Sequence, residues 1–198
     1  MSLLSHLSQK EIESCEIVSL DKEEIVLRES EPCRGVYLLK SGRIKISSFT
    51  LDGNEIVYNL IEGDGIFGNN LVFASDNRIR GNAIALEKTE LVYIPKENLK
   101  EILMSNGEFL EEYLKAQADF GKELNLKIKI LSFDSAKERL DFYLSQKEGK
   151  IVFRSVTELA DRLFMKRETL SRLIHEEEKQ GRIILQKNLI ISVNENGR

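Results

Sequence analysis

The side chains in this sequence with the clearest chemical use are Arg167, Glu168 and Arg172, near its C-terminal end. Arginine can donate two hydrogen bonds to O6 and N7 of guanine, and glutamate can accept one from N4 of cytosine. In a helix that begins near residue 167, these side chains share one face with Ser171 and His175. The pattern predicts a surface for the major groove of DNA. The spacing equally fits a solvated charged face with internal salt bridges.

Candidate metal ligands and nucleophiles are scarce. The sequence has two cysteines and two histidines, at Cys15, Cys33, His6 and His175. An iron–sulfur cluster needs about four thiolates, so we expect none within this chain. We expect each thiol to be a small buried apolar residue, with a redox role as the alternative. We expect His6 to face solvent, although it could in principle bind haem. Residues 16–95 contain no histidine, so a cupin-like enzyme with clustered ligands is not expected, and we predict no metal site and no enzymatic activity.

The composition is that of a globular protein with an uneven charge. Of 198 residues, 41% are hydrophobic and 31% are charged, which is ordinary for a soluble domain. No apolar run approaches the roughly 18 residues of a membrane span, and no signal peptide is evident, so we expect a cytoplasmic protein without a membrane partner. Residues 150–198 carry ten Lys or Arg and seven Asp or Glu, a net charge of +3, whereas residues 1–149 carry −7. A basic end suits a polyanionic partner, or it is simply solvated surface.

Residues 16–95 alternate between apolar and polar positions and are divided by glycines. Asp52-Gly53-Asn54 is a hairpin turn signal, because glycine tolerates positive φ, and Gly63 marks a second turn. Short strands at regular spacing with glycine turns predict an antiparallel barrel or jelly roll. The strands are expected near residues 36–39, 43–46, 55–60, 83–86 and 90–94.

From Pro95 onward the apolar period becomes helical. Apolar residues recur every three or four positions over about three heptads, as in a coiled coil. We predict an intermolecular seam, because a long helix beside a small barrel lacks enough surface to cover within its own chain. The alternative is a helix packed on its own barrel. Gln117 is a polar seam position that could fix the register. The predicted seam consists of Leu110, Tyr113, Leu114, Gln117, Phe120, Leu124, Ile128 and Leu131.

The C-terminal residues predict a two-helix unit followed by a hairpin. A helix is expected after an N-cap at Asp134, running to about Gln146. Ser155, with Glu158 three residues later, fits a capping box at the next helix. A further helix ends at Gly181, which suits the C′ position. The strands expected in this unit are 151–153, 183–185 and 189–193, the last two forming a wing.

Together these features resemble the Crp/Fnr family of transcription regulators. Residues 157–183, with RETLSRLI at 167–174, are similar to the family's winged helix-turn-helix, and the barrel glycines are similar to those of its cyclic-nucleotide-binding-type roll. The resemblance covers nearly the whole chain. It implies an α+β fold with an N-terminal antiparallel β-roll or jelly roll, a long dimerisation helix and a C-terminal winged helix-turn-helix. The implied domains are 1–105 (effector-sensing roll), 106–133 (dimerisation helix) and 134–198 (DNA-binding domain).

The resemblance also implies roles for single residues of the DNA-binding domain. Arg167, Glu168 and Arg172 match the family's base-reading positions, for a half-site resembling TGTGA. Phe164 stands where the family usually has a turn glycine, and Lys166 where it usually has a capping Ser or Thr. A non-glycine residue at positive φ costs roughly 1 kcal/mol or more, so either the turn has another shape or burial of the ring offsets the strain. The residues implied to lie near DNA phosphates are Lys166, Thr169, Ser171 (alternatively a small spacer) and Lys187.

The effector site departs from the family's cyclic-AMP-binding members. In those relatives a Glu after the Phe-Gly step bonds the ribose, and an Arg further along neutralises the cyclic phosphate. Asn69 takes the first position here and Ile79 the second, between Arg78 and Arg80. Because asparagine offers no carboxylate, we do not expect cyclic AMP to bind. We expect both arginines to be surface charges, unless a one-residue slip of the loop turns one inward. The candidate effector pocket is Phe67, Gly68, Asn69, Arg78 and Arg80, for an effector that the sequence does not identify.

The sequence therefore predicts a homodimeric, sequence-specific DNA-binding regulator. Its predicted target is a two-fold palindrome of TGTGA-like half-sites, and its β-roll is expected to respond to an unidentified effector. The implied partners are double-stranded DNA, a second copy of the chain and, for an activator, RNA polymerase. The alternative is an effector-sensing β-roll protein whose DNA-binding domain is degenerate, as the changes at Phe164 and Lys166 suggest.

Overall fold

A computed structural model describes residues 3–193 and divides into two compact units. The first ends at Asp119 and the second begins at Phe120. The division by packing falls inside one long helix, so the boundaries expected at 105 and 133 stay predictions about independent folding. Within residues 3–193, no helix is both long enough and apolar enough to cross a membrane.

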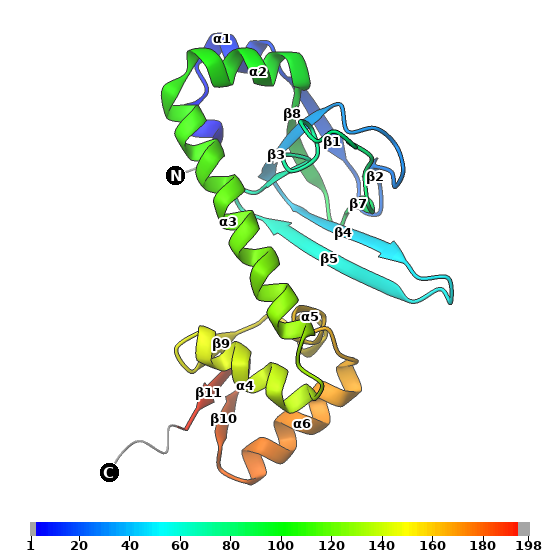
Figure 1. Cartoon of the computed structure of the whole chain (residues 1–198), viewed down its shortest axis with the longest axis vertical. Helices are drawn as coiled ribbons and strands as arrows, with labels where there is room; N and C mark the ends of the chain where they lie inside the picture. Colours follow the sequence, from blue (N-terminus) through cyan, green and yellow to red (C-terminus); the bar gives the residue numbers. More distant parts are fainter. Residues whose placement is uncertain (1–2, 194–198) are drawn as a thin grey trace. The chain divides into compact units, whose positions relative to one another are not determined.

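The first unit is built on two four-stranded antiparallel sheets (Figure 1). One sheet has the order β1-β8-β3-β6 and the other β2-β7-β4-β5. A cluster of buried apolar side chains, including Leu39 and Leu91 from the first sheet and Ile44 and Ile61 from the second, fills the space between them. The predicted jelly-roll-like fold is confirmed. The strands are β1 (Glu16–Leu20), β2 (Ile25–Leu27), β3 (Gly35–Ser41), β4 (Arg43–Phe49), β5 (Glu55–Glu62), β6 (Ile66–Phe67), β7 (Asn82–Ala85) and β8 (Thr89–Pro95).

The hairpin between β4 and β5 forms where the turn signal predicts it. Arg43 pairs with Glu62 at one end and Phe49 with Glu55 at the other. Gly53 has a φ of +78°, a conformation that residues with a Cβ adopt at a cost. The sequence pattern therefore fixes both the turn and the pairing of this hairpin.

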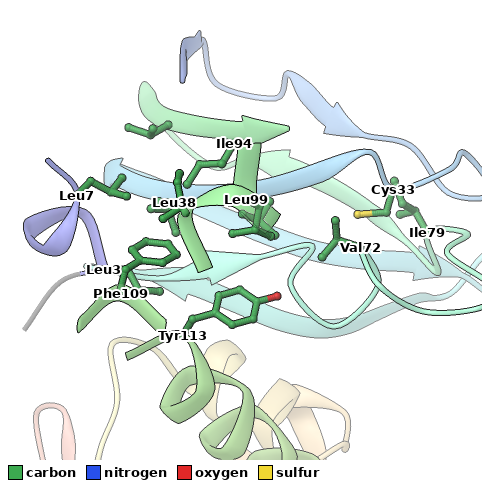
Figure 2. Packing of buried hydrophobic residues seen from close by; sticks show 13 residues of the cluster. Leu3, Leu7, Cys33, Leu38, Val72, Ile79, Ile94, Leu99, Phe109 and Tyr113 are labelled. Atoms are coloured by element: carbon green, nitrogen blue, oxygen red, sulfur yellow. The ribbon is translucent and has the colours of Figure 1, made fainter. Parts of the chain in front are cut away.

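Helices cover one end of the first unit. They are η1 (Leu3–His6), α1 (Gln9–Glu13), α2 (Lys96–Ser105) and the first part of α3 (Gly107–Leu131). Figure 2 shows Leu38 and Ile94 of the sheet close to Leu99 of α2 and Phe109 of α3, all four in one buried cluster.

Asn106 separates α2 from α3. Its side-chain oxygen accepts a hydrogen bond from the Phe109 amide at 3.0 Å, and its amide nitrogen donates to the carbonyl of His6 at 2.8 Å. The His6 side chain is only 14% exposed and lies 3.6 Å from a Glu108 carboxylate oxygen. The expectation that His6 faces solvent is wrong, because this contact holds η1 against the start of α3.

The second unit consists of three helices, a three-stranded sheet and the last part of α3. Its buried core joins Ile130 of α3 to residues of every other element, among them Leu140, Leu159, Ile174 and Ile190. The helix before the sheet is capped by Ser135, not by the predicted Asp134, and the Ser135 side chain forms a full capping box with Glu138. The elements are α4 (Ala136–Gln146), β9 (Lys150–Val152), α5 (Val156–Arg162), α6 (Arg167–Lys179), β10 (Ile183–Gln186) and β11 (Leu189–Ser192), with sheet order β10-β11-β9.

Candidate nucleic-acid interface

Helices α5 and α6 form a helix-turn-helix (Figure 1). Their inner faces are apolar. Leu159 and Leu163 at the first helix, and Leu170 on the second, are completely buried. Ser155 caps α5 by accepting a hydrogen bond from the Glu158 amide at 3.1 Å. The predicted capping box is only half formed, because the Glu158 carboxylate accepts from the amide of Arg154 instead of Ser155.

The turn between α5 and α6 contains a strained residue. Phe164 has a φ of +51°, so the positive φ that the sequence predicts at this position is present although the residue is not glycine. Its ring packs against the buried core of the second unit. Its carbonyl oxygen accepts a hydrogen bond of 2.6 Å from Arg139 of α4. Ring burial and this charge-assisted bond both offset a cost of roughly 1 kcal/mol for the backbone conformation.

The outer face of α6 carries the charged residues that the sequence predicts to enter the major groove. Arg167, Glu168 and Arg172 are all exposed. Within residues 3–193, their side chains form no hydrogen bond or ion pair with another residue. The internal salt bridges of the alternative interpretation are therefore not formed, even between Glu168 and Arg172, which lie four positions apart. The inner face of α6 is buried in the core of the second unit, and the outer face exposes the three side chains that are predicted to read bases.

Four further residues were predicted to lie near phosphates. Lys166 precedes α6 in an extended conformation and makes no side-chain capping bond, as expected from the loss of a capping Ser or Thr. Ser171 is exposed on the same helix, and Thr169 is half-buried. Lys187 is exposed at the turn between β10 and β11, which form the predicted wing. These four residues remain candidates for backbone contacts.

Sequence reasoning missed one residue that organises this interface. Glu177 of α6 is 3% exposed and contacts Arg182 and Lys137. The hydrogen bonds from Arg182, ahead of those from Lys137, outweigh burial and hold the pKa of Glu177 at about 2. Its place three residues after Ile174 and seven after Leu170, on the apolar face, is the signal that could have found it.

Comparisons with known proteins agree with this architecture. Among solved structures, a CooA variant from Carboxydothermus hydrogenoformans has a TM-score of 0.77 at 21% identity, covering 98% of this chain and 92% of that chain. The family profile of the cyclic nucleotide-binding domain matches residues 17–106. The "Anaerobic regulatory protein" of Bacillus subtilis is 24% identical over 190 residues, which cover 90% of this chain and 76% of that protein. The "Cyclic AMP receptor protein" of Thermus thermophilus is 26% identical over 152 residues, 75% of this chain and 70% of that protein.

Residues 17–106 of the chain match a cyclic nucleotide-binding domain, and most of its length is similar to these two bacterial proteins. Within residues 3–193, no three His, Cys, Asp or Glu side chains gather closely enough to hold a metal ion.

The candidate effector residues do not come together. Asn69 is 5% exposed and its carbonyl accepts hydrogen bonds from the Tyr113 hydroxyl at 3.2 Å and the Gln117 amide at 2.7 Å. Its own side-chain amide donates to Gln117 at 3.0 Å. Arg78 and Arg80 are exposed instead, bonded to the carbonyl of Ser30 and the carboxylate of Asp76.

The inward position between the two arginines belongs to Ile79, which is buried. Phe67 is also buried and stacks on Tyr37, with ring centroids 5.1 Å apart. Gly68, at a φ of +83°, brings its backbone against that of Gly35. Arg78 and Arg80 do not turn inward, which agrees with the expectation that both are surface charges, and the effector pocket stays a prediction.

Both thiols have the environment of structural cysteines. Cys33 is buried and its Sγ donates to the carbonyl of Gly35 at 3.2 Å, while half-buried Cys15 donates to the carbonyl of Glu11 at 3.1 Å. Burial raises the pKa of both thiols. Since the thiolate is the reactive form, this geometry favours a packing role over the redox alternative.

The residues of the predicted seam have two different environments along α3. Tyr113 is 4% exposed and belongs to the core of its own unit, so its assignment to an intermolecular seam is wrong. Gln117 is engaged by Asn69 and Tyr113 of its own chain, which replaces its predicted register role. Leu110 and Phe120 are half-buried. The exposed seam residues are Leu114, Leu124, Ile128 and Leu131.

Proposed function

We propose that this chain is a Crp/Fnr-type regulator that binds a two-fold palindrome of TGTGA-like half-sites as a homodimer. The observation that carries the proposal is the outer face of α6, where Arg167, Glu168 and Arg172 are exposed and unpaired within the described chain. Arg167 and Arg172 would each donate to guanine, and Glu168 would accept from cytosine. Lys166, Thr169, Ser171 and Lys187 would contact phosphates and fix the register without reading sequence.

The exposed apolar residues of α3 support the homodimer. Leu124, Ile128 and Leu131 lie within one third of the helix circumference and are all exposed. A contiguous apolar strip on a helix is typical of a surface that a partner covers. A parallel pair of such helices would present two recognition helices to half-sites one helical turn apart.

Control by a small effector in the β-roll is the remaining part of the proposal. The cyclic nucleotide-binding domain profile supports it, whereas the neutral, internally bonded Asn69 and the outward arginines argue against cyclic AMP as that effector. RNA polymerase would be a partner if the protein activates transcription.

The deciding experiment is selection of random duplex DNA by the purified full chain at a stated salt concentration, because affinity for DNA depends steeply on salt. We expect enrichment of a palindrome with TGTGA-like half-sites. Recovery of an unrelated palindrome would reject the assigned base contacts but keep the dimeric regulator.

The same selection tests the alternative function. The positive φ at Phe164 and the missing side-chain cap at Lys166, the N-cap residue of α6, favour a degenerate DNA-binding domain. That function would be supported if no sequence is enriched with the free protein or with a panel of candidate effectors, while the C-terminal unit remains folded.

A further inference from the structure

Glu177 is the middle residue of three consecutive glutamates, and it alone of the three faces inward. Glu176 and Glu178 are exposed, whereas Glu177 is among the few charged residues buried in the described chain. Its position continues the row of Leu170 and Ile174 along the inner face of α6. An ionised side chain therefore occupies a place that the helical period assigns to an apolar one.

The carboxylate of Glu177 joins three elements. Nζ of Lys137, on α4, lies 2.9 Å from its Oε2. Nε of Arg182 donates to Oε2 at 2.5 Å, and the Arg182 Nη2 atom donates to Oε1. The two bonds from one guanidinium make a two-point contact, which fixes direction as well as distance.

Arg182 lies where the wing leaves the recognition helix. It directly precedes β10, and its carbonyl accepts a hydrogen bond from the Val193 amide at 2.8 Å, closing the base of the hairpin. Its own amide donates to the Glu177 carbonyl at 3.0 Å. The side chain and the backbone of Arg182 are thus both bonded to Glu177, in the last turn of α6.

Apolar packing also contacts this junction, through Ile183 and Ile190 in the core of the second unit. Apolar contact is not directional, so it permits small rotations of the hairpin against the helix. The two-point contact between Arg182 and Glu177 restricts these rotations. A rotation would break a hydrogen bond to a buried charge, and that loss has a high cost in free energy.

We propose that Glu177 is a positioning residue that fixes the wing against the recognition helix. The consequence for DNA binding rests on the proposed function. When the wing is fixed against α6, the base contacts of α6 and the phosphate contact of Lys187, at the far end of the wing, form at the same time. Lys137 extends the same restraint to α4. Glu177 itself touches no DNA in this arrangement.

The test compares Glu177→Gln with Glu178→Gln in the full chain. Both variants remove one negative charge from the same helix, but only the first disturbs the contacts with Arg182 and Lys137. Binding is measured with the palindromic duplex recovered by selection, over a salt series, and amide hydrogen exchange is followed in the free protein. Circular dichroism and thermal melting establish that each variant is folded.

For Glu177→Gln we expect about tenfold weaker specific binding, equivalent to about 1.4 kcal/mol, and a salt slope smaller by about one phosphate contact. We also expect faster exchange of the Val193 amide and the wing. Glu178→Gln should show none of these changes. If the two variants have equal affinity, salt slope and exchange, the positioning role is rejected.

A second variant covers the case in which Glu177→Gln fails to fold. Arg182→Lys keeps both charges and leaves Lys137 in place, so the buried carboxylate stays compensated while the two-point contact is lost. The same drop in affinity and slope is expected. If Arg182→Lys has the amide hydrogen exchange rates and the salt dependence of DNA affinity of the wild type, the proposal is rejected. Absence of specific binding by the wild type would reject the DNA function alone, since hydrogen exchange still reports on the wing.

Discussion

Arg167 carries the sharpest single-residue prediction, because its exposed guanidinium has no partner within the described chain. Arg167→Ala should weaken binding to the selected site by about 1–3 kcal/mol and relax the choice at one base pair. Lys179→Ala is the matched control, since it removes one positive charge from the same helix outside the predicted contact face. Competition binding with single-base variants of the site measures both effects. An equal loss on random DNA would contradict a base-reading role.

Glu177 gives a prediction about acid stability. Its pKa is about 2 in the folded protein, against an ordinary value of 4.5. The ion pair therefore stabilises the fold fully above pH 4.5, and this contribution is lost as the pH falls toward 2. The shift corresponds to about 3 kcal/mol. Urea unfolding of the wild type and Glu177→Gln between pH 5 and 2 should show the difference in unfolding free energy shrinking with acid. A pH-independent difference would show that the carboxylate is not held ionised.

Phe164 and Glu177 show which features of single residues could be predicted from the sequence and which could not. Positive φ at Phe164 could be predicted, because family resemblance places a glycine there. The support from Arg139 could not be, since it comes from a side chain 25 positions away. Glu177 was missed for a related reason: a run of three glutamates suggests solvent until the helical phase is set by the buried Leu170 and Ile174.

Among the elements, turns and the strands next to them were predicted best because their signals are local, whereas β1, β2 and β6 were not predicted. Gly53 specifies the β4–β5 hairpin within a few residues, and Gly181 ends α6 at the predicted C′ position. The start of α4 shifted by one residue, since Ser135 and Asp134 are both good N-caps and only Ser135 forms the box with Glu138. Local chemistry fixes the element but not which of two neighbouring caps is used.

Helix α3 shows why periodicity alone misassigns a face. Tyr113 and Gln117 follow the same three- and four-residue spacing as Ile128, yet they bond to Asn69 of their own unit. The pattern predicts that one face of the helix is buried. It does not predict whether residues of the same chain or of a second copy bury it. Distant loop residues such as Asn69 decide that question, and their position is not encoded in the helix.

The exposed part of α3 makes a prediction about assembly. Ile128 is 65% exposed, so Ile128→Glu should leave the monomer folded while placing a charge in the proposed seam. We expect a shift from dimer to monomer by light scattering, together with weakened DNA binding. Lys122→Glu introduces the same side chain away from the apolar strip, with a net charge change of two units against one, and should remain dimeric. A monomeric wild type would contradict the seam.

At the scale of the whole molecule, we predict that the protein does not respond to cyclic AMP. Asn69 is bonded to Gln117, and the arginines nearest to it in sequence point outward. A ligand that binds only the folded state raises the melting temperature by mass action. We expect millimolar cyclic AMP to leave both the melting temperature and the DNA affinity unchanged. A clear rise in either would show that the loop at residues 74–78 rearranges to admit a phosphate.

The two compact units share α3, and this has a consequence for how such a gene can be divided. Ile130, near the end of that helix, is buried in the core that also contains the recognition helix. A coding fragment that starts at residue 134 would leave out this side chain and the half-buried Leu126. Any recombination event that exchanges the DNA-reading part between relatives must therefore carry the last turns of α3 with it. The point at which these genes can be joined therefore lies within α3, N-terminal to the helix-turn-helix.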